Sequence, residues 1–205
     1  MKGGDPFHLR SSLMLLLFYY GGHMKYIKAK SISYASKKRN KKDVRFIVLH
    51  YTGNKGDTAK GNATYFKTSN NREAGAHFFV DRSGNTIKSI AMERVAWAVG
   101  GAKYTDCAKT GGGKLYGKCT NYNSVSIELC DILDKKPSEK QIEAIKETIK
   151  YIRKYCVNAK YITFHWCVNG KHCPLTMMKP EQYKPFLKAI GEEKNFISDE
   201  NDLKL

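Results

Sequence analysis

A continuous apolar run is the sequence feature that most restricts the fold. Residues 46–49 read Phe-Ile-Val-Leu and stand between Arg45 and His50. A run of strand length without polar interruption is typical of a central β-strand that is covered on both faces. The chain is therefore predicted to form a sheet with further layers packed against it, as in an α/β domain.

The remaining segments alternate between strand and helix patterns. Strands are predicted within residues 24–32 and over residues 75–80, 86–90, 124–130 and 160–164. The second and third of these flank a loop with Gly84 and predict a hairpin. Helices are predicted over residues 58–68, with Thr58 as N-cap, and over residues 138–157 and 180–190. This order predicts α/β architecture: a single domain with a central mixed β-sheet flanked by helices.

The clearest single element is the helix over residues 138–157. Ser138 and Gln141 follow Pro137 with the spacing of a capping box. Isoleucines then recur at helical spacing and predict one apolar face, made by Ile142, Ile145, Ile149 and Ile152.

The two ends of the chain differ from its middle. Residues 1–23 contain an apolar run of eight residues, too short for a membrane span of about 20 residues. Asp5-Pro6 and a poor cleavage site argue against a signal peptide, and the Gly-His-Met junction before residue 24 indicates a vector-derived leader. The domain is therefore expected over residues 24–190, followed by a polar tail over residues 191–205.

Charge points to the kind of partner. The 205 residues include 36 Lys and Arg against 19 Asp and Glu, a net charge of +17. Such a balance indicates a polyanionic partner, namely nucleic acid, an anionic membrane or an anionic cell wall. With 41% hydrophobic residues, a packed core is possible and wholesale disorder is excluded.

The six cysteines contain no Cys-x-x-Cys pair, which disfavours a zinc ribbon or a thioredoxin-like site. We expect reduced thiols. If oxidised, Cys107 and Cys119 could tether the long loop predicted over residues 100–123.

Three residues with metal-binding side chains lie at or after predicted strand ends. His50 ends the apolar run, His165 follows the strand over residues 160–164, and Cys173 comes eight residues later. Open α/β sheets place their sites at strand ends, and a catalytic zinc takes three protein ligands with a fourth position open. The spacing alone is a weak signal, since a His at a strand end is often structural.

A carboxylate lies in the middle of a predicted strand. Over residues 124–130, Val125, Ile127 and Leu129 alternate with polar residues, so Glu128 lies on the opposite face. From the pattern alone, Glu128 is either a solvated strand residue or a catalytic base. Lys171, two residues before Cys173, is by the same standard an ordinary surface lysine.

Several motifs, taken together and in order, resemble a known family between about residues 45 and 190. They are Phe46-Ile-Val-Leu-His50-Tyr-Thr52, Ala76-His77-Phe78-Phe-Val80-Asp81, Ala96-Trp97 with Gly100, Asn123-Ser124-Val-Ser-Ile-Glu128-Leu-Cys130, and Thr163-Phe164-His165 with Lys171-x-Cys173-Pro174. This pattern resembles the zinc-dependent N-acetylmuramoyl-L-alanine amidases, whose type-2 amidase fold is shared by phage endolysins and peptidoglycan recognition proteins.

The resemblance implies roles for particular residues. His50, His165 and Cys173 would hold one Zn²⁺, Glu128 would act as general base, and Lys171 would stabilise the oxyanion. Trp97 and His77 are expected to bind substrate, with His77 in a supporting position. Some members carry a catalytic tyrosine where this chain has Ala76, so the endolysin branch that uses a strand glutamate is the closer match. Ala98 likewise replaces a histidine of many members.

The implied activity is hydrolysis of the amide between N-acetylmuramic acid and L-alanine in peptidoglycan, with wall lysis. The composition resembles that of clostridial proteins and indicates a low-GC Gram-positive bacterium or its phage. Because the chain has no convincing signal peptide, a phage or prophage endolysin, made in the bacterial cytoplasm and released by a holin, is expected; a secreted autolysin is the alternative. A non-catalytic recognition module is the competing class, but non-catalytic members of the fold typically lack the third ligand, which is present here as Cys173. No nucleic-acid motif accompanies the charge, so anionic wall polymers are the expected partner of the basic surface.

Overall fold

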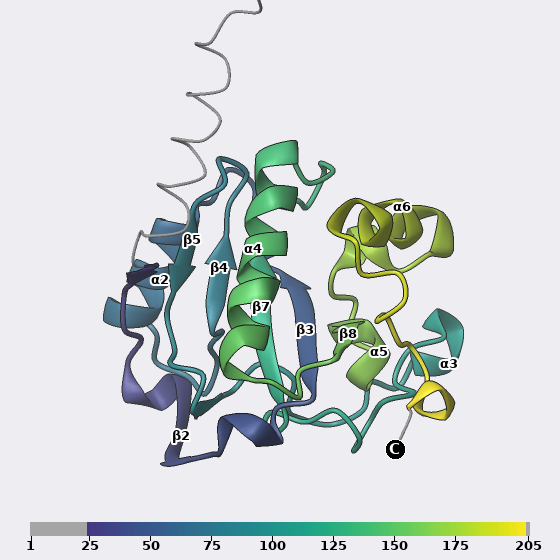
Figure 1. Cartoon of the computed structure of the whole chain (residues 1–205), viewed down its shortest axis with the longest axis horizontal. Helices are drawn as coiled ribbons and strands as arrows, with labels where there is room; N and C mark the ends of the chain where they lie inside the picture. Colours follow the sequence, from purple (N-terminus) through teal and green to yellow (C-terminus); the bar gives the residue numbers. More distant parts are fainter. Residues whose placement is uncertain (1–23, 204–205) are drawn as a thin grey trace, which may run out of the picture.

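A mixed six-stranded sheet organises the fold (Figure 1). The computed structural model describes residues 24–203, so the predicted leader over residues 1–23 lies outside the described part. Strand order is β1 (Lys25–Tyr26), β5 (Thr86–Lys88), β4 (Phe78–Val80), β7 (Ser124–Leu129), β3 (Phe46–Tyr51) and β8 (Tyr161–Phe164). Strands β4 and β5 are antiparallel, and the other neighbours are parallel. The predicted hairpin, mixed sheet and α/β class are confirmed.

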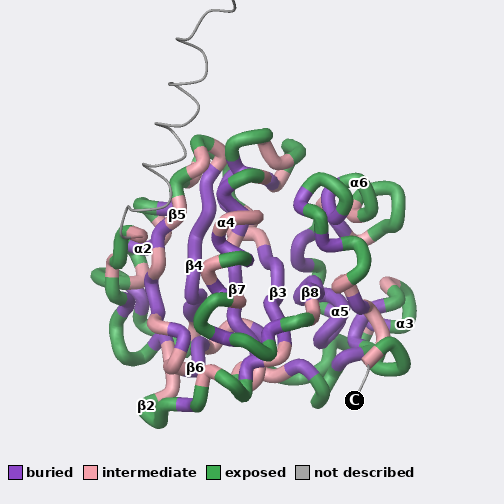
Figure 2. Tube along the Cα trace, viewed as in Figure 1, coloured by how far each residue is buried: buried purple, intermediate pink, exposed green. Residues whose placement is uncertain are grey.

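Strand β3 has parallel neighbours on both sides. Phe46 lies opposite Ser124 of β7 and opposite Tyr161 of β8. The four residues of the apolar run, Phe46 to Leu49, are all 0% exposed. Figure 2 shows buried residues concentrated on the central strands and exposed residues on the surrounding loops. The prediction of a central strand covered on both faces is confirmed.

Helices cover the two faces of this sheet. Phe78 of β4 contacts Tyr151 of α4 (Glu139–Tyr155), with ring centroids 6.0 Å apart. The next residue, Phe79, packs with Ala59 and Ala63 of α2 (Ala59–Thr68). Since successive strand residues point to opposite faces, α2 and α4 lie on opposite sides of the sheet. Helix α6 (Pro180–Ile190) contacts α4 and joins the same core.

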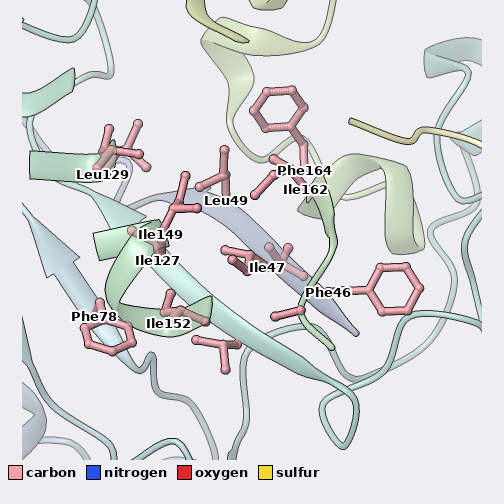
Figure 3. Packing of buried hydrophobic residues seen from close by; sticks show 14 of the residues in the cluster. Phe46, Ile47, Leu49, Phe78, Ile127, Leu129, Ile149, Ile152, Ile162 and Phe164 are labelled. Atoms are coloured by element: carbon pink, nitrogen blue, oxygen red, sulfur yellow. The ribbon is translucent and has the colours of Figure 1, made fainter. Parts of the chain in front are cut away.

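The isoleucine face of α4 lies against the sheet (Figure 3). Ile145, Ile149 and Ile152 are at most 1% exposed. Ser138 caps the helix, its hydroxyl accepting from the Gln141 N–H at 3.1 Å. The reciprocal half of the predicted capping box is absent. Instead the buried Gln141 side chain donates to the carbonyls of Val80 and Cys130, at 2.9 and 3.0 Å, and so ties α4 to the ends of β4 and β7.

Several short elements were not predicted. Strands β2 (Tyr34–Lys38) and β6 (Arg94–Ala96) form an antiparallel pair beside the main sheet. The expected long loop contains one short helix, α3 (Cys107–Thr110). A second short helix, α5 (His165–Asn169), begins directly after β8. Single 3-10 turns cover Ser31–Ser33, Lys41–Asp43, Leu175–Met177 and Glu200–Asp202. The strand expected within residues 24–32 is reduced to the two residues of β1.

The polar tail expected from residue 191 onward packs against the domain over its described part, residues 191–203. Glu192 is 6% exposed and pairs with Arg153 of α4 at 2.6 Å. Phe196 forms a bridge to Ile162 of β8, and Ile197 is buried in the core. The segment after α6 therefore packs onto the edge of the domain, because a long-range ion pair and a β-bridge hold it there.

The six cysteines all have free thiols and are all buried. Cys107 and Cys119 are therefore not joined in this structure. Within residues 24–203, every helix is too short or too polar to cross a bilayer.

Candidate metal centre

Three predicted ligands meet at the carboxyl ends of β3 and β8. His50 is near the end of β3, and His165 is the first residue of α5, directly after β8. Adjacent parallel strands end at the same edge, so the two histidines are neighbours. Gly170, with φ 84°, ends α5 and turns the chain back. The Cys173 carbonyl then accepts from the Trp166 N–H at 2.9 Å, which places Cys173 beside the histidines.

The three side chains form a compact cluster. One candidate ligand atom from each lies within 4.8 Å of those of the other two. The ring centroids of His50 and His165 are 4.6 Å apart, and Cys173 Sγ lies 3.8 Å from His50 Nδ1. Exposure is only 1% for His50, 4% for His165 and 3% for Cys173. The structure thus brings together the residues that sequence reasoning grouped.

The chemistry of this cluster fits a zinc ion. His50 Nε2 and both ring nitrogens of His165 are buried without any hydrogen-bond partner. Such orphaned polar atoms are rare in protein interiors. A tetrahedral zinc, with Zn–N near 2.0 Å and Zn–S near 2.3 Å, keeps its ligand atoms roughly 3.3 to 3.8 Å apart. The Cys173 Sγ–His50 Nδ1 separation of 3.8 Å is at the upper end of this range. A metal ion would take one nitrogen from each ring, which gives His165 a partner that the protein itself does not supply.

Burial sets the protonation of the two histidines. It lowers the pKa of His165 to about 3, with the Lys171 charge adding to the effect. It also lowers the pKa of His50 well below its ordinary value, assisted by His165 and Lys171. Both rings are therefore neutral at physiological pH, which is the form that binds metal ions.

The thiol behaves differently. Burial, followed by the Glu128 carboxylate, raises the pKa of Cys173. Without a nearby cation the thiol would stay protonated, whereas coordination to a metal ion deprotonates a cysteine outright.

Glu128 lies on the strand next to His50. The two residues are opposite each other in the β3–β7 register and so share one face of the sheet. Glu128 Oε2 is buried and has no hydrogen-bond partner. Burial raises the pKa of Glu128 to about 7; the Lys171 ammonium opposes this shift and Asp57 adds to it. This carboxyl group can exchange a proton near neutral pH.

Lys171 lies on the turn between α5 and Cys173. Its N–H donates to Asn169 Oδ1 at 3.0 Å, and its side chain is exposed. Its charge nevertheless lowers the pKa of Glu128, His50 and His165. Lys171 is therefore a cation at the edge of the cluster, close enough to act on it.

Trp97 follows β6 and is half-buried. It lines a hollow of about 530 Å³ together with Tyr116, Tyr122 and Val168. Val168 belongs to α5, the same helix that begins with His165. The hollow thus adjoins the element that carries one of the candidate ligands, and three aromatic rings are part of its lining.

His77 is placed differently from the sequence-based expectation. The ring is 1% exposed, and Nδ1 lies 3.0 Å from Ser126 Oγ. Nε2 lies 3.1 Å from Arg39 and 3.1 Å from the Arg94 carbonyl. Both nitrogens contact protein groups inside the domain, which leaves no face for a substrate. We therefore propose that His77 is a buried structural residue that does not contact the substrate.

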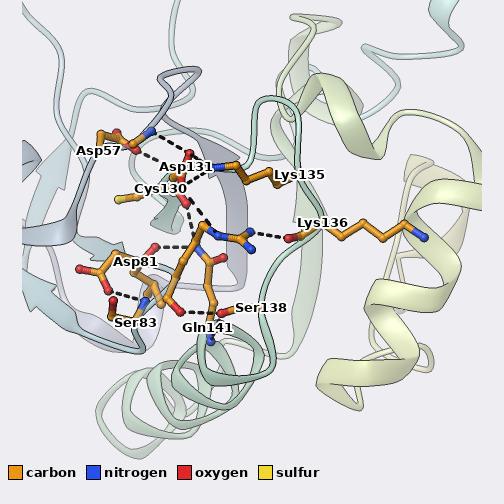
Figure 4. A network of polar contacts seen from close by, with 12 residues as sticks. Asp57, Asp81, Ser83, Cys130, Asp131, Lys135, Lys136, Ser138 and Gln141 are labelled. Carbon is orange, nitrogen blue, oxygen red and sulfur yellow. Dashed lines mark hydrogen bonds and ion pairs between the residues drawn. The ribbon is translucent and has the colours of Figure 1, made fainter.

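Asp57 is a residue near the centre that sequence reasoning missed. Its carboxylate accepts from the Asp131 N–H at 2.6 Å and from Asn62 at 2.7 Å, within the polar network at the end of β7 (Figure 4). Asp57 thereby fixes the loop after β3 onto β7 and contributes to the high pKa of Glu128. The sequence signal for a tight loop after β3 was the pair of glycines Gly53 and Gly56, both of which adopt positive φ in the structure.

The sequence and the fold both match known proteins. Residues 40–176, about two thirds of the chain, match the family model described as N-acetylmuramoyl-L-alanine amidase. The matched segment includes every member of the candidate metal cluster. The chain belongs to this family and is an enzyme of the N-acetylmuramoyl-L-alanine amidase class. Among curated protein sequences, none matches the chain.

Solved structures share the fold. PlyL is 20% identical, with 82% of this chain and 97% of that chain covered, at a TM-score of 0.61. A mutant endolysin from Bacillus subtilis is 19% identical, with 82% and 99% covered, at 0.59. An endolysin amidase, LysCS, from Clostridium intestinale is 16% identical, with 75% and 90% covered, at 0.50. At these identities the likeness establishes the mixed α/β amidase fold.

Proposed function

We propose that this chain is a zinc-dependent amidase that cleaves the bond between N-acetylmuramic acid and L-alanine in peptidoglycan and thereby lyses the cell wall. One observation carries the proposal: His50, His165 and Cys173 converge with orphaned ring nitrogens beside the buried carboxyl group of Glu128. Membership of the amidase family supplies the bond that is cleaved.

His50, His165 and Cys173 would hold the ion through two neutral imidazoles and one thiolate. When bound, zinc supplies Lewis-acid polarisation of the scissile carbonyl and lowers the pKa of a bound water to about 7. The cluster is buried, so charges that develop there are little screened by bulk water.

Glu128 is proposed as the general base. It would take a proton from the attacking water and pass it to the nitrogen of the leaving L-alanine. A base works best when its pKa lies near the operating pH, and burial holds the pKa of Glu128 at about 7. Its unpartnered Oε2 is free to accept that proton.

Lys171 is proposed to stabilise the negative charge that develops on the carbonyl oxygen. An ammonium aimed at such an oxyanion lowers the barrier, because the interaction strengthens as the charge grows. The exposed side chain of Lys171 already acts electrostatically on Glu128 and both histidines. Trp97 would line the substrate groove from the neighbouring aromatic hollow.

The proposed biological role is that of a phage or prophage endolysin, made in the cytoplasm and released to the wall. Support comes from structural neighbours that are endolysins by name. Secretion as a host autolysin uses the same chemistry, so the genomic neighbourhood decides between the two.

Turbidity loss of purified Gram-positive walls, with and without a chelator, tests the activity. New L-alanine N-termini without new reducing sugar ends would identify the bond. Activity that survives both the chelator and Cys173→Ser would overturn zinc dependence.

A further inference from the structure

The end of the sheet opposite the metal cluster carries a charged hollow of about 860 Å³. Four cations line it, Lys42, Arg45, Lys160 and Lys194, together with the rings of Tyr122 and Tyr161. Arg45 and Lys160 directly precede β3 and β8, whereas His50 and His165 stand at the other ends of these strands. Five residues of extended chain separate Arg45 from His50 by about 16 Å. The hollow and the metal cluster are thus separate sites, although Tyr122 also lines the hollow beside Trp97.

The hollow has an excess of positive charge. Within residues 24–203, none of its four cations has a carboxylate within ion-pair distance, and three of them, Lys42, Lys160 and Lys194, are exposed. Two carboxylates, Asp43 and Asp202, also line it. Asp43 accepts from the Tyr122 hydroxyl at 3.3 Å, which occupies part of its hydrogen-bonding capacity. Four cations against two anions leave a net positive field in a concave surface, where it is focused.

The walls of the hollow are built from the sheet and held in place. The Arg45 N–H donates to the Asn123 carbonyl at 2.9 Å, and the Tyr161 N–H donates to the Arg45 carbonyl at 3.1 Å. The Asn158 side chain donates to the Lys42 carbonyl at 2.8 Å, which joins the turn before β3 to the turn before β8. The backbone that carries the cations is therefore preformed, so little of the site has to be ordered when a ligand binds.

The basic surface continues past the rim. Lys41 and Lys154 both lie over the exposed ring of Tyr155, at 5.4 and 5.7 Å from its centroid. A long polyanion seated in the hollow could therefore contact further cations along its length, whereas a single small anion could not.

We propose that this hollow binds an anionic phosphodiester polymer of the cell wall. Repeating phosphates match the spaced cations, and the hydroxyl-rich units between them match the tyrosine rings. The inference rests on the proposed function, because a wall substrate brings the enzyme to polymers attached to that wall. Two weak contacts at opposite ends of the domain would then reinforce each other by effective concentration.

Two binding measurements on the full chain test the proposal. The first uses soluble poly(glycerol phosphate). The second uses purified sacculi before and after hydrofluoric acid has extracted their phosphodiester polymers. The test variant is Lys160→Ala with Lys194→Ala. The matched control is Lys60→Ala with Lys67→Ala, which removes the same charge from exposed positions on α2. We expect the Kd for the polymer to rise at least fivefold in the test variant and less than twofold in the control. Extraction of the sacculi should abolish the difference between them.

Three outcomes would overturn the proposal: equal loss in both variants, no loss in the test variant, or a short DNA duplex binding more tightly than the polymer with the same sensitivity to the test variant. Cleavage of a small soluble muropeptide, measured in parallel, should stay unchanged in both variants. If the wild-type chain bound the polymer but did not cleave muropeptides, the proposed function would fail while the hollow's ligand class stood.

Discussion

His50 and Glu128 occupy opposed positions on adjacent parallel strands, and both point to the same face of the sheet. The sheet register therefore sets the separation between the first candidate zinc ligand and the candidate base. A backbone ladder on two buried strands is among the most rigid parts of a domain. Such a frame can hold two reacting groups at a constant distance.

Glu128→Gln removes the base and keeps the size and shape of the side chain. We expect kcat for muropeptide hydrolysis to fall by roughly 10²- to 10⁴-fold, the usual contribution of a general base. Zinc content, measured by mass spectrometry of the purified protein, should remain near one per chain because the three ligands are intact. Glu193→Gln, an exposed glutamate after α6, is the control and should leave kcat unchanged.

Cys173→Ser tests the metal cluster by stability as well as by activity. A ligand that binds only the folded state stabilises it by about 4 kcal/mol at 1,000 times its Kd. Wild-type protein should therefore lose several degrees of Tm when a chelator is added, whereas Cys173→Ser should start lower and respond little. Cys156→Ser changes another buried cysteine in the core and should retain the chelator response. The same response in Cys173→Ser as in wild type would remove Cys173 from the ligand set.

Lys171 should influence the pH dependence of the reaction. The base must be unprotonated, so kcat/KM should rise with pH through the pKa of Glu128, which burial raises and a bound zinc ion would lower. The Lys171 ammonium lowers that pKa, so its removal should move the acid limb of the profile to higher pH. Lys171→Ala is therefore expected to lower kcat and shift the limb upward, while Lys171→Arg should keep the limb near its wild-type position. An unshifted limb in Lys171→Ala would show that the lysine does not act on Glu128.

Sequence patterns predicted correctly those elements whose buried face can be recognised from neighbouring residues alone. The apolar run of β3 and the isoleucines of α4 each define a buried face without reference to the rest of the chain. Strand β2 was missed because Tyr34–Lys38 is basic and does not alternate; its pairing with β6 holds it in place. Gln141 was expected to cap its own helix, but two carbonyls at the ends of β4 and β7 compete for its amide.

Long-range contacts account for the other differences. The burial of Glu192 depends on Arg153, which lies 39 residues earlier in the chain. The candidate metal residues could be grouped in advance only because parallel strand ends meet at one edge and because the ordered motifs resemble a family. The cations of the opposite hollow are scattered from Lys42 to Lys194, and no sequence spacing connects them.

His77 predicts how the domain responds to acid. Burial, with the Arg39 charge adding to it, lowers the pKa of His77 to about 3, against about 6.5 in an unfolded chain. Between these values the unfolded state binds a proton that the folded state does not, so stability falls as pH drops below about 6.5. The slope for one such group is about 1.4 kcal/mol per pH unit. Urea unfolding between pH 7 and pH 5 measures the total slope, to which His50 and His165 also contribute because burial lowers their pKa too. The part due to His77 is the difference between the wild type and a His77 variant.

The variant His77→Gln isolates this contribution. It should be less stable than wild type at pH 7, because the ring contacts Ser126, Arg39 and the Arg94 carbonyl. Its stability should nevertheless decline less steeply between pH 7 and pH 5, since the titrating group is gone. If His77→Gln and wild type lost stability in parallel, the acid sensitivity would arise from groups other than this buried ring.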